Sequence, residues 1–443
     1  MATPSDPAAV TIPVREAPVL AHADVVVAGG GPAGLGAALA AARLGARVVL
    51  CERYGFLGGN FTVASVGTIC GLYRNDGGGV FTSVVGGIAG ELTAMLERDG
   101  AGMGPVPFKQ TAVFVYVPWA AKRAADHLVT SEERVDLLLH ALVADALVAD
   151  GRLRALVLAT KHGPRAVTGS VFVDCTGDAD VATYAGVPTV LGPPGARQHA
   201  SMQFWLQHAD GERAMAAMGS LGDAIAANGA YLSRDGGVLI PTLRPGEFLG
   251  AMTRVRNPDG SPIDATDLRQ ATWGELEGRR LAEEAAAFVR EHVDGFADSF
   301  LADTATALGV RESRRIEGVT TLTGADVQRG AQFADAVAEG AWPQEYHVHD
   351  RSTEYRFLPD GTSYQIPFGA LRAREVANLL VAGRCISADH DALASTRVMA
   401  PSLALGQAAG TAAALAVRDG VTPDAVDVVE LQATLRNAGA LIS

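Results

Sequence analysis

Cysteine is scarce in this chain, and its spacing excludes several kinds of redox and metal chemistry. Among 443 residues there are four cysteines, none within three positions of another: Cys51, Cys70, Cys175 and Cys385. The sequence therefore has no Cys-x-x-Cys pair for disulfide exchange, no cysteine zinc site and no iron–sulfur motif. Few, scattered cysteines are typical of a reducing compartment, so we expect a cytoplasmic protein.

Basic residues are also in deficit. The 36 Lys and Arg residues face 49 Asp and Glu residues, which gives a formal net charge of −13. A chain without a basic excess is poorly suited to a phosphate backbone, so we expect no nucleic-acid partner. The first 23 residues lack a basic segment followed by an apolar one. This predicts no secretory signal, with residues 1–7 as a loose tail.

No apolar run has the character of a membrane span. The longest, residues 398–417, is interrupted by Pro401, Ser402, Gln407 and Thr411. A bilayer core favours an unbroken apolar segment of similar length. We therefore predict a buried helix over this run and no membrane partner.

Glycine, in contrast, is abundant. It accounts for 51 of 443 residues, well above the usual share of roughly 7%. Apolar residues make up 48% of the chain and charged residues 19%. This composition predicts a compact chain with a large core and many tight turns, not a disordered one.

A strand, a glycine turn, a helix and a second strand follow one another near the N-terminus. Residues 24–28 are a β-branched run, residues 29–34 read Gly-Gly-Gly-Pro-Ala-Gly, residues 35–44 are rich in alanine, and residues 46–51 form the second run. This is a βαβ unit. Its continuous apolar strands predict a parallel sheet covered by helices on both faces.

The glycine turn matches the Gly-x-Gly-x-x-Gly fingerprint of dinucleotide-binding proteins through Gly29, Gly31 and Gly34. The first glycine permits the turn, the second lets a diphosphate approach, and the third allows close helix packing. The next strand ends at Glu52, an acid placed to accept hydrogen bonds from adenosine ribose hydroxyls. We predict NAD or FAD here; the alternative is a glycine-rich turn without a ligand.

The remaining pattern predicts an α/β fold made of a Rossmann-like, three-layer domain with an inserted α+β substrate domain. Expected helices cover residues 91–97, 118–128 and 403–417, and expected strands cover 134–143, 153–159, 170–174 and 378–382. From residue 192 charged residues and tryptophan become frequent, and the buried-strand pattern returns near residue 378. We therefore predict a nucleotide domain over 20–191 and 366–443, with the insertion over 192–365.

Five segments together resemble an FAD-dependent oxidoreductase family among the glutathione-reductase-like flavoproteins, related to the flavoprotein subunits of fumarate reductase and succinate dehydrogenase. They are Glu52-Arg53, Gly58-Gly59-Asn60, Asp174-Cys175-Thr176-Gly177-Asp178, Gly309-Val310-Arg311-Glu312-Ser313-Arg314-Arg315 and Asn378-Leu379-Leu380-Val381-Ala382-Gly383-Arg384. The resemblance spans about residues 20 to 420 and is weakest between residues 192 and 308. It implies FAD as the cofactor.

The resemblance also implies which residues bind FAD. The glycine segments would run beside the diphosphate and ribityl chain, and the helix after Pro401 would direct its N-terminus at the flavin N1–C2=O edge, where reduced flavin gathers negative charge. For each glycine the alternative is a plain turn. The implied cofactor-binding residues are Gly29, Gly31, Pro32, Ala33, Gly34, Glu52, Arg53, Gly58, Gly59, Asn60, Val143, Thr176, Gly177, Asp178, Gly383, Arg384, Ser402 and Leu403.

Candidate catalytic residues come from three segments. Arg311, Arg314 and Arg315 would bind a substrate acid group or the flavin diphosphate through bidentate guanidinium contacts; the alternative is a run of salt bridges with Glu312 and Glu317. His390, beside Asp389 and Asp391, is a candidate general base, and Arg397 follows shortly before the flavin-facing helix. An ordinary loop histidine is the alternative for His390.

Three more histidines lie in the predicted substrate domain. His347 and His349 share one side of an expected strand, as a metal pair would, but no third ligand is nearby, so we predict no metal site and instead a pocket wall or a plain strand. His347 is the fourth candidate catalytic residue, with Arg311, His390 and Arg397. His199 is a further candidate for the pocket wall.

Without a Cys-x-x-Cys pair, hydride transfer to flavin N5 is the chemistry that we expect. The sequence thus predicts an FAD-dependent dehydrogenase or oxidase. Its expected substrate is a small molecule, and anionic molecules are among the candidates. The alternatives are a flavin monooxygenase, disfavoured because Gly383-Arg384 stands where such hydroxylases usually carry Gly-Asp, and a non-catalytic dinucleotide-binding module. Neither the substrate nor the oligomeric state follows from the sequence.

Overall fold

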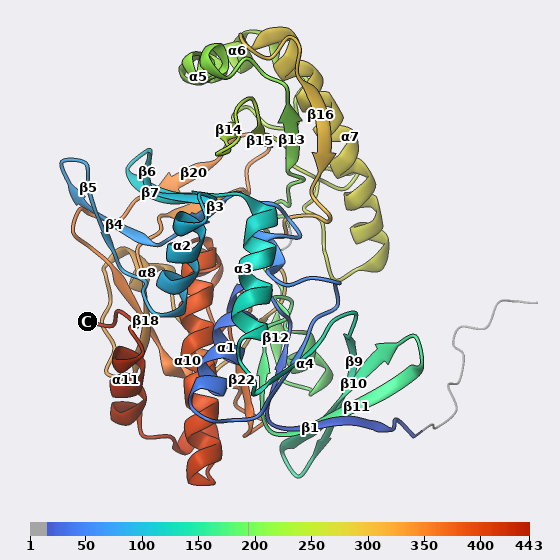
Figure 1. The fold of residues 1–443 in the computed structure, drawn as a ribbon, viewed down its shortest axis with the longest axis vertical. Helices are drawn as coiled ribbons and strands as arrows, with labels where there is room; N and C mark the ends of the chain where they lie inside the picture. Colours follow the sequence, from blue (N-terminus) through green and yellow to red (C-terminus); the bar gives the residue numbers. More distant parts are fainter. Residues whose placement is uncertain (1–15, 194) are drawn as a thin grey trace, which may run out of the picture.

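The computed structural model describes residues 16–193 and 195–443, so the tail expected over residues 1–7 lies outside the described residues. The chain forms two lobes (Figure 1). The larger lobe holds the main sheet and both ends of the described chain, and the smaller lobe stands above it and carries the longest helix, α7.

The main sheet has seven strands. Its parallel part runs in the order β8, β2, β1, β11, β22, and β10 and β9 continue from β11 as an antiparallel meander. The bounds are β1 Val19–Ala28, β2 Val48–Cys51, β8 Val135–Leu138, β9 Leu142–Ala149, β10 Arg152–Thr160, β11 Gly163–Asp174 and β22 Leu379–Val381. The β-branched run 25–28 is fully buried at its centre, as expected for a strand covered on both faces.

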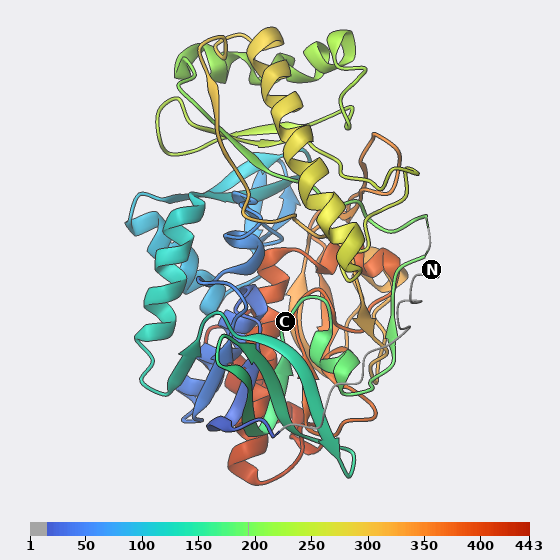
Figure 2. The ribbon, with the colours of Figure 1, turned by 90° about the vertical axis from the view of Figure 1, so that its right-hand side faces the viewer.

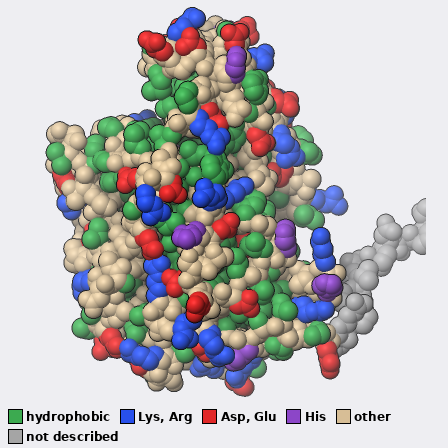
Figure 3. Space-filling model, in the orientation of Figure 1, with side chains coloured by type: hydrophobic (Ala, Val, Ile, Leu, Met, Phe, Trp, Pro, Cys, Tyr) green, Lys and Arg blue, Asp and Glu red, His purple; other side chains and the backbone are tan. Residues whose placement is uncertain are grey.

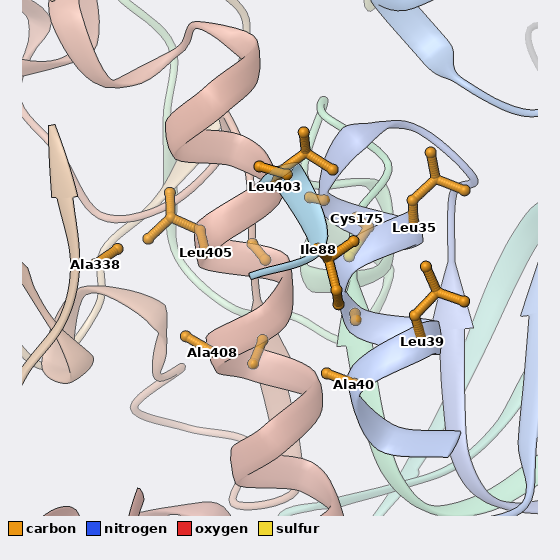
Figure 4. Close-up of a cluster of buried hydrophobic side chains, with 14 of the residues drawn as sticks. Leu35, Leu39, Ala40, Ile88, Cys175, Ala338, Leu403, Leu405 and Ala408 are labelled. Carbon is orange, nitrogen blue, oxygen red and sulfur yellow. The ribbon is translucent and has the colours of Figure 1, made fainter. Parts of the chain in front are cut away.

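Two helices, α1 (Pro32–Arg43) and α10 (Met399–Asp419), pack side by side against this sheet (Figure 4). Glycines make the close approach possible. A Cβ atom added to Gly406 would collide with the carbonyl oxygen of Ala33, and one added to Gly410 would collide with that of Ala37. Helix α10 is therefore buried, as the sequence predicts. It is the one described helix long and apolar enough to span a membrane, and 89% of its most apolar window lies inside the protein.

The same lobe carries smaller sheets and further helices around α10. A three-stranded sheet of β3 (Thr68–Cys70), β7 (Thr111–Tyr116) and β6 (Gly102–Phe108) forms its upper edge, beside the hairpin of β4 (Tyr73–Gly77) and β5 (Val80–Ser83). Helices α2 (Ile88–Arg98) and α3 (Pro118–Thr130) pack beside them and bury mainly aliphatic side chains. The remaining elements of this lobe are η1 Gly59–Phe61, α4 Asp180–Tyr184, β12 Thr189–Val190, β17 Arg315–Ile316, α8 Gly324–Gln328, β18 Ala336–Gly340, β19 Gln344–Tyr346, β20 Glu354–Arg356, β21 Tyr364–Pro367, η3 Phe368–Leu371, α9 His390–Thr396, η4 Pro423–Ala425 and α11 Val428–Asn437.

The upper lobe has its own core. Its antiparallel sheet runs in the order β14, β15, β13, β16, and α7 packs along it (Figure 2). The bounds are β13 Phe204–Gln207, α5 Gly211–Ala217, η2 Met218–Ser220, α6 Leu221–Asn228, β14 Val238–Pro241, β15 Phe248–Ala251, α7 Leu268–His292 and β16 Phe300–Thr304. Buried side chains between Ala200 and Leu308 form this core. Buried side chains between Leu322 and Ile366 belong instead to the core of the larger lobe. The boundaries of the insertion at residues 192 and 365 stay a prediction.

The predicted fold class is confirmed: the chain is an α/β protein with a parallel sheet of the Rossmann-like kind. One predicted strand is wrong. Residues 134–143 contain the whole of β8 and the start of β9, separated by a turn in which His140 has a φ of 56°. The sequence does not reveal this turn, because the apolar pattern continues across it and the residues on both sides are suited to a strand.

Candidate functional site

Two cavities meet in the middle of the molecule. The first cavity encloses about 300 Å³ and lies at the carboxyl ends of the parallel strands of the main sheet. The second cavity encloses about 320 Å³ and lies between the β3–β7–β6 sheet and the β14–β15 edge of the upper lobe. On the face drawn in Figure 3, hydrophobic side chains lie beside Lys and Arg side chains below the upper lobe.

The first cavity opens where β1, β2, β11 and β22 end. Gly29 follows β1, Glu52 follows β2, Cys175 follows β11 and Ala382 follows β22, and all four line the cavity. In open α/β sheets, ligands bind at the carboxyl ends of the strands. The four ends therefore define one binding crevice.

The glycine turn shapes the floor of this cavity. Gly29 has a φ of +97°, and a Cβ atom on Gly34 would collide with the carbonyl oxygen of Gly29, so both positions require glycine. Gly31 and Gly59 face each other so closely that a Cβ on Gly59 would lie 2.8 Å from the Cα of Gly31. Helix α1 begins at Pro32 with no side-chain cap on its N-terminus. Backbone and unpaired N–H groups thus form a cradle that suits a diphosphate.

Glu52 is fixed at the end of β2 by backbone donors. Its Oε2 accepts a hydrogen bond from the Gly30 N–H at 2.6 Å, and its Oε1 accepts one from the Tyr54 N–H at 2.8 Å. Burial raises the pKa of this carboxyl, and the two backbone donors and Arg53 oppose the rise. Each oxygen keeps a second acceptor site, so Glu52 is able to take hydrogen bonds from ribose hydroxyls.

The turn after β11 is held in place by hydrogen bonds to Asp174. Asp174 is fully buried and accepts hydrogen bonds from the Thr176 N–H, the Thr176 hydroxyl and the Ala182 N–H. Burial raises the pKa of Asp174. The turn then presents Thr176, Gly177 and Asp178 to the first cavity.

Asp178 and Arg384 form an ion pair at the far wall of the first cavity. The Arg384 Nη2 donates to Asp178 Oδ1 at 2.8 Å, and its Nη1 donates to Ser313 Oγ at 3.0 Å. Although burial opposes it, the Arg384 guanidinium lowers the pKa of Asp178. Asp180 lies nearby and pairs with Arg314; burial and the neighbouring Asp178 and Asp174 raise its pKa to about 6.

Most of the residues predicted to bind the cofactor line the first cavity. They are Gly29, Gly31, Pro32, Ala33, Glu52, Arg53, Gly59, Asn60, Val143, Thr176, Gly177, Asp178, Gly383, Arg384 and Ser402. The structure places the other three behind its wall. Gly34 packs against Gly29, Gly58 donates its N–H to the Gly30 carbonyl, and Leu403 is buried in α10.

Sequence reasoning missed several residues of the first cavity. Tyr54, Val63, Asp180, Glu275, Val310 and Met399 also line it. Glu275 belongs to α7 of the upper lobe, more than 200 residues from the glycine turn, and no motif marks it. The upper lobe thus contributes a wall to the first cavity as well as to the second.

The second cavity has apolar walls and a polar end. Its walls come from Val66, Val106, Pro107, Phe108, Val113, Val115, Val238, Leu239, Ile240, Pro241, Trp342 and Val398. Its polar end carries Ser201, Gln203, Arg234, Arg311, Glu345, His347, Tyr355 and Arg397. This division is typical of small-molecule sites, in which a few polar groups orient a ligand whose body is held by apolar contacts.

Glu345 is the hub of the polar end, and no sequence motif marks it. Its Oε1 accepts hydrogen bonds from Tyr355 at 3.0 Å and pairs with His347 Nε2 at 2.9 Å, and its Oε2 accepts from Trp342 Nε1 at 3.2 Å and Arg397 Nη2 at 3.3 Å. Although burial opposes it, His347 and the guanidinium groups of Arg397 and Arg311 lower the pKa of Glu345 well below its usual range. Glu345 is therefore a carboxylate.

His347 lies in the wall of the second cavity as a neutral imidazole. Burial, together with the nearby guanidinium of Arg311, lowers its pKa well below the usual value. Its Nε2 faces the Glu345 carboxylate, so Nε2 carries the proton, and its Nδ1 lies 3.4 Å from Arg254 Nη2 and from Thr353 Oγ1. Nδ1 thus accepts from these two donors, and the lowered pKa makes His347 a weak base.

Four residues line both cavities: Asn60, Val310, Arg397 and Met399. Met399 is the first residue of α10, whose N-cap, Val398, provides no side-chain hydrogen bond. The positive end of the longest buried helix of this lobe is therefore directed at the junction of the two cavities.

Three of the four predicted catalytic residues reach the second cavity, and one does not. Arg311, His347 and Arg397 line it. His390, in contrast, lines neither cavity. It is the first residue of α9, and its Nδ1 bonds to Glu312 Oε1 at 3.0 Å. Its position soon after β22 predicts a place at the site, but α9 begins at His390 and the side chain bonds to Glu312 instead.

The arginine run 311–315 is divided among three environments. Arg311 faces the second cavity, Arg314 pairs with Asp180, and Arg315 pairs with Glu312 at 2.7 Å. The alternative interpretation gives the Arg315–Glu312 ion pair, whereas binding of an acid group by Arg311 stays a prediction.

The other histidine candidates lie outside the cavities. His199 is buried and its Nδ1 has no hydrogen-bond partner among the described residues; burial and the nearby Arg254 lower its pKa to about 4. His349 is half exposed and pairs with Glu354 at 3.0 Å. Over residues 16–193 and 195–443, no group of three or more His, Cys, Asp or Glu side chains has the arrangement of a metal site.

Comparison with known families gives one match, which covers nearly the whole chain. The family described as FAD dependent oxidoreductase matches residues 24–435. No curated protein sequence matches the chain at a significant level.

Solved structures of similar fold include three enzymes or enzyme-like proteins. A geranylgeranyl bacteriochlorophyll reductase-like protein from Thermoplasma acidophilum is 12% identical, with 94% of this chain and 82% of that chain covered and a TM-score of 0.45. A p-nitrophenol 4-monooxygenase from Pseudomonas putida is 13% identical (93% and 84% covered, TM-score 0.46), and a myxobacterial chondrochloren halogenase is 15% identical (94% and 79% covered, TM-score 0.45). At these identities and TM-scores, the likeness supports no conclusion about this chain.

Proposed function

Because the chain belongs to the FAD dependent oxidoreductase family, we propose that it oxidises a small organic molecule held in the second cavity. FAD is the cofactor, and the first cavity is where the chain would hold it. The observation that carries the proposal is the junction of the two cavities at Asn60, Val310, Arg397 and Met399. A substrate in the second cavity would therefore touch a group that fills the first.

The residues of the first cavity fit FAD. The cradle of Gly31, Gly59 and the start of α1 suits the diphosphate, and Glu52 suits the adenosine ribose. The N-terminus of α10 supplies positive potential at the junction, where a flavin ring that takes up electrons gathers negative charge. When bound, FAD supplies a hydride acceptor at its N5 atom.

The polar end of the second cavity offers fixed polar groups that orient a substrate. Tyr355 donates to Glu345, and Glu345 in turn holds the Nε2–H of His347. His347 is neutral and its Nδ1 faces Arg254 and Thr353, so its role is to hold the Glu345 carboxylate in place. Arg311 and Arg397 flank this chain of groups and orient the substrate.

Anaerobic mixing of the purified holoenzyme with candidate substrates tests this proposal. We expect loss of the yellow flavin absorbance without oxygen and without NAD(P)H, because the substrate itself delivers the hydride. Reduction that requires NAD(P)H would indicate a monooxygenase instead. A flavin that no electron donor reduces would indicate a non-catalytic binding module, and a chain that never retains FAD would contradict the cofactor assignment.

A further inference from the structure

Positive charge exceeds negative charge at the polar end of the second cavity. Three arginines line this end, Arg234, Arg311 and Arg397, whereas Glu345 is the one carboxylate among the described residues that line it. His347 does not offset the difference, because its imidazole is neutral. The protein therefore keeps at least two guanidinium charges here without acidic partners.

Arg311 has neutral partners only. Its Nη1 donates to the carbonyl oxygen of His199 at 2.8 Å and to Ser201 Oγ at 2.9 Å. No described carboxylate lies within salt-bridge distance of it, and burial and the neighbouring Arg397 lower its pKa to about 9. These contacts fix the plane of the guanidinium and leave its charge uncompensated.

Arg397 is compensated only in part. Its Nη2 reaches Glu345 Oε2 at 3.3 Å, a long contact that Glu345 shares with Trp342, Tyr355 and His347. Its side chain is 9% exposed, and its Nε–H is buried without a hydrogen-bond partner among the described residues. A buried donor in this state is costly unless a ligand satisfies it.

The remainder of the second cavity suits an apolar body. Phe108, Val113, Ile240 and Trp342 lie among its walls. Its volume of about 320 Å³ is roughly twice the ~150 Å³ of an engineered apolar cavity that accepts one benzene ring. A ligand larger than one ring thus fits beside the arginines.

We propose that the substrate is an organic acid, in which one carboxylate is bound by Arg311 and Arg397 and is attached to an apolar body that lies against Phe108, Ile240 and Trp342. This inference rests on the proposed function for the oxidation itself, but the binding of the acid does not depend on turnover. A carboxylate satisfies both guanidinium groups with charge-assisted hydrogen bonds and removes their mutual repulsion.

Calorimetric titration of the holoenzyme with matched probes tests the inference without turnover. The probes are 3-phenylpropionate, its primary amide, and acetate, which separate the charge from the apolar body. We expect 3-phenylpropionate to bind at least about tenfold more tightly than either of the others, in the range for hydrogen bonds to charged groups. Equal affinity of acid and amide would overturn the assignment of the carboxylate, and equal affinity of 3-phenylpropionate and acetate would overturn that of the apolar body.

Variants locate the binding of the acid within the cavity. We expect Arg311→Met to weaken the binding of 3-phenylpropionate at least about tenfold and to leave the binding of the amide unchanged. Arg311→Lys should restore part of the preference for the acid over the amide. Arg213→Met, on the exposed surface of the upper lobe, is the matched control, since Arg213 pairs with Asp294 far from the lining residues. FAD content and circular dichroism show whether Arg311→Met folds. If it does not, Arg311→Lys and the comparison of acid with amide on the wild type test whether the carboxylate binds at Arg311.

The two proposals fail in different ways. Tight binding of acids combined with a flavin that no acid reduces would overturn the proposed oxidation and leave the acid site standing. Flavin reduction by neutral compounds, with no preference for acids and no effect of Arg311→Met, would overturn the acid site and leave the oxidation standing.

Discussion

The two cavities of this protein are built from different materials. The first cavity is made largely of backbone at strand ends, with glycines at 29, 31, 59, 177 and 383 lining it. The second is made of side chains brought together from β3, β6, β7, β14, β15, β19, β20 and the segments before β13, after β16 and before α10. A dinucleotide needs the same backbone cradle in every chain, whereas a substrate is recognised by side chains that vary. The difference explains why one cavity is visible in the sequence and the other is not.

The largest expected effect belongs to the backbone cradle. Gly31→Val places a branched side chain where Gly31 faces Gly59, so we expect the affinity for FAD to fall by at least about 100-fold while the fold is retained. The flavin absorbance of the purified protein, relative to its protein absorbance, measures this. Gly219→Val is the control, because a Cβ at Gly219 has open space around it. A fully flavin-loaded Gly31→Val protein would contradict this account of the cradle.

Glu345→Gln tests the side-chain cavity next. The glutamine side chain replaces one accepting oxygen with an NH₂ group, which then faces the N–H donor of Trp342 or of Arg397. The substitution also leaves a further guanidinium group without a carboxylate partner. We expect the free energy of unfolding to fall by about 3 kcal/mol, as when one partner of a buried ion pair is removed. Urea unfolding followed by circular dichroism measures it, and a loss under about 1 kcal/mol would show that Glu345 is not the hub we describe.

Asp180 gives a smaller, pH-dependent effect at the edge of the first cavity. Because its pKa is raised from 3.8 to about 6 in the folded protein, ionisation of Asp180 destabilises the fold as pH rises from 4 to 7. Asp180→Asn does not titrate. Relative to the wild type, its free energy of unfolding should rise by roughly 2 kcal/mol over this interval, measured on flavin-free protein. A pH-independent difference between the two proteins would contradict the assignment.

The smallest expected effect is at His390. Since it bonds to Glu312 outside both cavities, we expect His390→Ala to change turnover by less than about threefold and to lower the free energy of unfolding by about 1 kcal/mol. Turnover with the substrate found by anaerobic screening measures the first, and urea unfolding the second. A tenfold loss of turnover with FAD and stability retained would restore the role of base that chain position alone suggested.

The fold and the first cavity were largely predictable because their signals are local. The βαβ unit at residues 24–52 contains the strand, the glycine turn and the acid within one short segment, and each follows from the backbone geometry that it must adopt. Glu275 was missed because it reaches the cavity from α7 in the other lobe. No rule of spacing connects it to the glycine turn.

The second cavity was predictable only in part. Arg311 was identified from its arginine run and Arg397 from its position shortly before α10, but Glu345, Tyr355 and Arg234 lie in short strands and loops whose patterns carry no chemical signature. His390 shows the limit of chain position as a guide. It follows a strand that ends at the cavity, and a single helix start is enough to direct it elsewhere.

The glycine-mediated packing of α1 on α10 has a consequence for synthesis of the chain. Helix α1 leaves the ribosome early, and its partner follows roughly 350 residues later, a delay of about 20–70 s at usual translation rates. During that time the face of α1 that receives Gly406 and Gly410 has no partner. Nascent chains that stop before α10 therefore expose this face and lack part of the FAD site. We expect FAD to bind after α10 has been synthesised.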